Sequence, residues 1–77
     1  MGRYEDLKAM IEALTLTITV HEGEEAFFRR SAEASSSQEV KTLFLEIAED
    51  MNSHLIGLEG RKEKLITELV NLFHFHF

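Results

Sequence analysis

The sequence contains no cysteine and no proline. Without cysteine the chain has neither disulfides nor thiolate metal ligands to stabilise a domain of only 77 residues. A core in this size range supplies only about 3–5 kcal/mol of net stability, so small domains commonly add a metal or a partner chain. The absence of proline removes the strongest helix breaker and favours long, uninterrupted helices.

Basic residues are few: 8 lysines and arginines stand against 14 acidic residues, for a formal net charge of −6. A phosphate backbone would be repelled on average, so we expect no nucleic-acid partner. The first residues, MGRYEDLK, are charged and do not resemble a secretory signal. No run approaches the roughly 20 apolar residues that span a bilayer, so we expect a cytoplasmic protein without a membrane partner.

Apolar residues recur every three or four positions in the first part of the chain, which is typical of a helix that packs one face on a partner. The stripe consists of Leu7, Ile11, Leu14, Ile18, His21, Glu25, Phe28 and Ala32. A second, overlapping face contains Met10, Ala13, Thr17, Val20, Glu24 and Phe27. We predict a first helix over about residues 3–34.

Residues 14–20 (LTLTITV) also fit a strand, because apolar residues alternate with threonine and β-branched side chains are frequent. We predict helix there because the flanks are helical and the chain offers no convincing partner strand. If the helix prediction failed, this segment would be the aggregation-prone window.

A serine run, 35–37, predicts a turn between two helices. Ser36 and Glu39 have capping-box spacing: the hydroxyl would accept from the amide of residue 39, and the carboxylate would reach back to the amide of Ser36. So short a connection makes the two helices antiparallel neighbours.

A second helix is predicted over about residues 38–60. Its stripe consists of Val40, Phe44, Ile47, Met51, His54 and Leu58, widened by Leu43, Ala48 and Leu55. Gly57 and Gly60 each weaken a helix by roughly 1 kcal/mol relative to alanine, and they predict either a kink or an end near residue 60. The helical pattern resumes over 64–73.

Two amphipathic helices of this kind cannot cover each other's apolar faces. We therefore predict an all-α protein: a single antiparallel hairpin over residues 1–77 that dimerises into a four-helix bundle, or assembles into a multiple of that dimer.

Two stretches, VHEGEEAFF (20–28) and EIAEDMNSH (46–54), give the chain a resemblance to the rubrerythrin and ferritin-like superfamily over about residues 10–60. Hairpins of that superfamily commonly carry Glu-x-x-Gly-x-x-Phe-Tyr on the first helix and Glu-x-x-His on the second. This chain keeps Gly23, the aromatic pair 27–28, Ala48 and His54. The resemblance implies dimerisation of single hairpins and iron held between helices.

Two positions depart from that pattern. The glutamates that would hold and bridge the metals fall on Val20 and Met51, whose side chains cannot neutralise iron. Met51 is most simply a core residue. The resemblance is therefore to a hairpin with a degenerate di-iron motif.

Other residues offer a replacement ligand set. His21, Glu24, Glu25 and His54 could form a site between hairpins, and Asp50 lies four residues before His54. Such a site would be rich in nitrogen and better suited to zinc or another late transition metal than to an oxygen-activating iron pair. The expected cofactor is iron or another divalent metal.

The sequence is equally consistent with a protein that binds no metal. His54 could be a core histidine hydrogen-bonded to Glu24, Glu25 or its symmetry mate, in a protein that serves as an assembly or interaction module. The chain has no nucleophile elbow, phosphate loop or dinucleotide turn, so an enzyme would have to be of the metal type.

The end of the chain alternates aromatics with histidines over 73–77, which predicts packing on a neighbouring chain, a docking peptide or an adventitious chelator.

Overall fold

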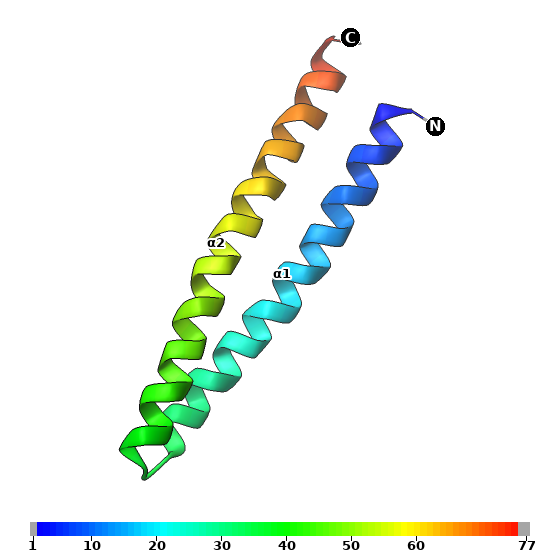
Figure 1. Cartoon of the computed structure of the whole chain (residues 1–77). Coiled ribbons are helices and arrows are strands. Elements are labelled where there is room, and N and C mark those ends of the chain that lie inside the picture. The colour runs from blue at the N-terminus through cyan, green and yellow to red at the C-terminus, as the bar shows by residue number, and fades with distance from the viewer. Residues whose placement is uncertain (1, 76–77) are drawn as a thin grey trace.

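The computed structural model describes residues 2–75 as two long helices, α1 (Arg3–Ala34) and α2 (Gln38–Phe75), joined by the turn 35–37. The helices lie antiparallel, so both ends of the chain are at the same end of the rod (Figure 1). The rod measures 59 × 16 × 15 Å, one helix pair thick. The described residues contain no strand, which confirms the prediction of an all-α hairpin. No helix in that part of the chain has an apolar stretch long enough to cross a membrane.

The predicted stripe of α1 is the face that packs on α2. Every one of its eight residues is buried or half-buried, with Leu7, Ile18 and Ala32 the most enclosed. The residues of the second face are mostly exposed, including Met10, at 38%, and Phe27, at 55%. The sequence pattern of α1 therefore located its buried face correctly.

The packed stripe of α2 agrees with the prediction only in part: Phe44, Ala48, Met51, Leu55 and Leu58 pack as predicted, whereas Val40, Leu43 and His54 are exposed. It consists of Lys41, Phe44, Ala48, Met51, Leu55, Leu58, Lys62, Leu65, Leu69 and Leu72, all buried or half-buried. His54 is exposed, so its placement on the buried face was wrong. The physical reason is that the predicted stripe, extended beyond Leu58, reaches the charged Arg61 and Glu68, whereas the observed one continues through leucines. Only the long stems of two lysines interrupt the observed stripe, and lysine can cover apolar surface while its ammonium stays in water.

The threonine-rich segment 14–20 is helical. Each threonine hydroxyl donates to a backbone carbonyl four residues earlier: Thr15 to Ile11 at 2.8 Å, Thr17 to Ala13 at 2.9 Å and Thr19 to Thr15 at 3.0 Å. These bonds keep the hydroxyls satisfied along the helix, and Ile18 reaches the core.

The cap of α2 lies one residue later than the capping box predicts. Ser37 Oγ accepts from the amide of Val40 at 3.3 Å, and its carbonyl accepts from Lys41 at 3.0 Å. Ser35 Oγ in turn accepts from the amide of Ser37 at 3.1 Å, which shapes the turn. The three consecutive serines gave the sequence no means of choosing among them.

The helix α2 does not end at Gly57 or Gly60 but continues to Phe75. A Cβ at either glycine would meet nothing within 4 Å. Near the end of the helix, the ring of Phe73 packs edge to face on Tyr4, with centroids 5.5 Å apart. Residues 76 and 77 of the aromatic tail lie outside the described residues.

Candidate functional site

A pair of histidines joins the two helices near the middle of the rod. The rings of His21 on α1 and His54 on α2 meet edge to face, with centroids 5.2 Å apart and an interplanar angle of 64°. His21 belongs to the packed stripe and is half-buried, whereas His54 lies beside the seam and is exposed. The structure thus brings together the two imidazoles among the predicted metal ligands.

Glu24 forms a hydrogen bond with His21 and not with His54. Its Oε1 lies 2.7 Å from His21 Nδ1, one helical turn away. A neutral His21 that donates its Nδ1–H to this carboxylate keeps its lone pair on Nε2. Carboxylates commonly orient metal-binding imidazoles in this way, so Glu24 is placed to position a ligand.

Glu25 is engaged elsewhere. Arg29 donates to its Oε2 at 2.9 Å and also approaches Glu49 at 3.6 Å. Hydrogen bonding to Glu25 is the main cause that raises the pKa of Arg29. A carboxylate already neutralised by a guanidinium is a weaker candidate for a metal than the histidine pair.

The donor set does not fit a ferritin-type iron pair. Val20 is 52% exposed, and Met51 is half-buried in the seam, so neither position offers the bridging carboxylate that such a pair requires. Within residues 2–75 no three histidine, aspartate or glutamate side chains of one chain are grouped to hold a metal ion. Two imidazoles and a carboxylate do fit part of a zinc-like site, whose remaining ligands would have to come from a second copy.

The histidine pair lies on an exposed, partly apolar side of the hairpin, which we call the docking face. In an antiparallel pair, the stripes that flank the seam on one side come from both helices. Here α1 contributes Met10, Ala13, Thr17, Val20, Glu24 and Phe27, and α2 contributes Val40, Leu43, Ile47, Asp50, His54, Gly57, Arg61 and Lys64. Five of the large apolar side chains among them are exposed, Met10 38%, Val20 52%, Phe27 55%, Val40 37% and Leu43 53%, whereas Ile47 is half-buried.

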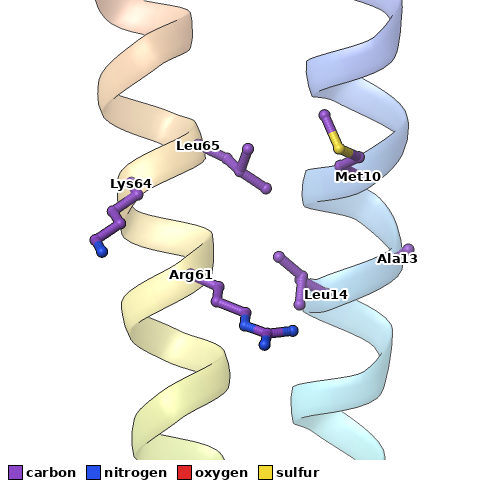
Figure 2. Close-up of a pocket in the computed structure, with 6 residues that line it drawn as sticks. All are labelled: Met10, Ala13, Leu14, Arg61, Lys64 and Leu65. Carbon is purple, nitrogen blue, oxygen red and sulfur yellow. The ribbon is translucent and has the colours of Figure 1, made fainter.

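A groove of about 480 Å³ opens on the docking face toward the chain ends. Figure 2 shows Leu14 and Leu65 pointing toward one another across the seam, with Met10 on α1 above Leu14. Arg61 reaches from α2 toward Leu14, while Lys64 extends along the outer side of α2 (Figure 2). The groove therefore has an apolar floor and the Arg61 cation on its α2 side, with Lys64 at its outer edge.

Sequence reasoning missed this groove. The signal was present in the second stripe of α1, but the matching stripe of α2 was assigned to the core. Comparisons of the chain with family models, with curated proteins and with solved structures found no match.

Proposed function

We propose that this protein is a self-assembling helical hairpin whose docking face pairs with that of a second copy, forming a four-helix bundle. The observation that carries the proposal is the side of the hairpin on which Val20, Phe27 and Leu43 are each more than half exposed. Exposed apolar patches often mark interaction surfaces. Other apolar side chains outside these two stripes are also exposed, among them Leu45, Ile56 and Val70. The docking face is distinguished from them because it also carries the groove and the histidine pair.

The small core supports the same proposal. The hydrophobic side chains that the hairpin buries are Leu7, Ile18, Ala32, Ala48, Leu55 and Leu58. Two of these are alanines, which bury little apolar area. A hairpin covers only part of a wide apolar face on each helix, and a second hairpin would cover the rest in a four-helix bundle.

Analytical ultracentrifugation of the untagged chain tests the proposal directly. We expect a dimer or a multiple of it, and a thermal unfolding midpoint that rises with protein concentration. Val20→Lys should shift the equilibrium toward monomer, because it places an ammonium on the docking face. Thr15→Lys is the matched control, since Thr15 is exposed and lies about 140° around α1 from Val20. A wild-type chain that stays monomeric at high micromolar concentration would refute self-assembly.

A second candidate function, metal handling between the hairpins, is favoured by the contact of His21 with both His54 and Glu24. His21 lies close to the middle of α1, which runs Arg3–Ala34. A two-fold axis at that level would bring the histidine pairs of both copies together. The resulting nitrogen-rich donor set suits zinc or another late transition metal.

Native mass spectrometry with elemental analysis tests metal binding after incubation with zinc or ferrous iron. A stoichiometric metal should disappear in His54→Ala and persist in His74→Ala, the control that removes a histidine far from the pair. Ferrous iron that oxidises no faster with the protein than in buffer alone would exclude an iron oxidase. Protein that remains metal-free under both incubations would leave self-assembly as the function.

A further inference from the structure

We infer that the second copy docks in the antiparallel sense, with its Phe27 filling the groove lined by Met10, Leu14 and Leu65 and its acidic residues facing Arg61 and Lys64. The inference rests on the proposed self-assembly and specifies the partner, the register and the contacts. The occupant of the groove is a second copy of this chain.

Charge along the docking face indicates this sense of docking. Glu24 and Asp50 lie on the part of the face nearer the turn, and Arg61 and Lys64 lie nearer the chain ends. Eleven residues separate Asp50 from Arg61, or about 16 Å of helix. Parallel docking would bring the two basic ends to the same level and the two acidic ends to the other, whereas antiparallel docking sets each acidic end against a basic end.

The spacing of the residues gives the register. Ala13 and Phe27 lie seven residues to either side of Val20, in one row along α1. Asp50 and Lys64 lie seven residues to either side of Gly57, in one row along α2. A two-fold axis that passes near Val20 and Gly57 therefore opposes Phe27 to the partner's Ala13 at the groove, and Asp50 to the partner's Lys64. Such an interface is self-complementary, as a two-fold dimer requires.

Shape agrees with that register. Phe27 is 55% exposed, and its ring packs edge to face on that of Phe28, with centroids 5.4 Å apart. The groove of about 480 Å³ is apolar at its floor and has room for a phenyl ring. At Gly57 a Cβ would meet nothing within 4 Å, so the missing side chain leaves space where the two hairpins would cross. Aromatic side chains that fill a partner's pocket dominate many interfaces.

Disulfide trapping tests the register cleanly because the chain has no native cysteine. We expect an equimolar mixture of Phe27→Cys and Ala13→Cys proteins to form a mixed crosslinked dimer, with little crosslinking of either protein alone. Val20→Cys should crosslink with itself, and Thr15→Cys, about 140° around α1 from Val20, should not. Circular dichroism of each reduced variant confirms that the helices persist.

The possible outcomes separate the inference from the proposed function. Self-crosslinking of Phe27→Cys or of Ala13→Cys would overturn the register. A wild-type dimer with no crosslink at positions 13, 20 or 27 would show that another surface mediates assembly. A monomeric wild type would overturn both self-assembly and the register.

A charge exchange provides a second, independent readout. Asp50→Lys and Lys64→Glu should each weaken the dimer roughly tenfold, the effect of about 1.4 kcal/mol. The double variant should recover most of the wild-type affinity, because it re-creates the opposite-charge pair with reversed signs. Lys8→Glu, off the docking face, is the control. A double variant that is weaker than both singles would refute the Asp50–Lys64 pairing.

Discussion

His21 and His54 meet edge to face across the two helices, with ring centroids 5.2 Å apart. His21 lies in the seam, while His54 lies just outside it and is exposed. The contact therefore marks the border between the packed interior of the hairpin and the docking face. Its two proposed roles, packing and metal binding, make different demands on the ring nitrogens.

Replacing His54 by phenylalanine separates those roles. His54→Phe keeps an aromatic ring against His21 but removes its nitrogen donors, so we expect hairpin stability near the wild-type value and loss of any bound zinc. His54→Ala removes both the ring and the donors. Thermal unfolding and elemental analysis of the two variants distinguish the roles, and a phenylalanine variant that retains stoichiometric zinc would exclude His54 as a ligand.

Leu7 should be among the most sensitive positions of the core. Its side chain is fully buried, at 0% exposure, next to the free end of α1. Leu7→Ala should lower the free energy of unfolding by about 2–5 kcal/mol, which is comparable to the whole stability of so small a core. Leu16→Ala, at a site 67% exposed, should change it by less than about 0.5 kcal/mol. Urea denaturation followed by circular dichroism checks both values.

The observed cap predicts which serine of the turn matters. Ser37→Ala should cost about 1 kcal/mol, because the amide of Val40 loses its acceptor. Ser36→Ala should have almost no effect, since the cap bonds in the turn come from its neighbours. Equal losses in the two variants, measured by chemical denaturation, would contradict this placement of the cap.

Gly23 offers a stabilising substitution. It lies inside α1, and a Cβ at this position would meet nothing within 4 Å, so alanine fits without strain. Gly23→Ala should raise the free energy of unfolding by up to about 1 kcal/mol, the helix-propensity difference between the two residues. It lies off the docking face, so the sedimentation of the dimer should stay unchanged. A fall in stability would show that something packs closely against this side of α1.

The ion pair between Arg3 and Glu68 predicts a pH dependence. Hydrogen bonding to Arg3 is the main cause that lowers the pKa of Glu68 below its ordinary value of 4.5. A lowered folded-state pKa means that the stabilisation is present above pH 4.5 and is lost as pH falls through the folded-state value. The pair is exposed, so the effect is small and weakens with salt.

Thermal midpoints of wild type and Glu68→Gln should therefore differ most at neutral pH and converge in acid. Glu12→Gln, an exposed carboxylate elsewhere on α1, is the control. A difference that is independent of both pH and salt would mean that Glu68 acts through packing of its stem.

Apolar periodicity located the whole buried face of α1 but only part of the buried face of α2. On α1 the apolar stripe beginning at Leu7 is distinctly richer than its neighbour, so periodicity identified the buried face. On α2 two adjacent stripes, one through Ile47 and His54 and the other through Ala48 and Leu55, are nearly equal up to residue 58. Which of them faces α1 depends on the whole length of the helix pair, since Arg61 and Glu68 make the first stripe costly to bury.

The candidate site was likewise predicted only in part from the sequence. The sequence named His21, His54 and Glu24, and in the structure His21 contacts both of the others. It also named Glu25, which the structure pairs with Arg29. Sequence periodicity cannot predict that Arg29 pairs with Glu25, because Glu49 is also within its reach. The choice of partner depends on how the side chains pack.

The amino-acid sequence by itself determined that this protein is helical, because uninterrupted three-and-four periodicity without proline excludes other regular structures over such lengths. It also determined the position of the turn, since the serine run breaks that periodicity. The tertiary structure decided which face of α2 is buried and which polar groups meet. Those outcomes depend on contacts between residues far apart in the chain. Two faces of α2 have similar hydrophobicity, and which of them is buried depends on its pairing with α1 along the whole length of the helices.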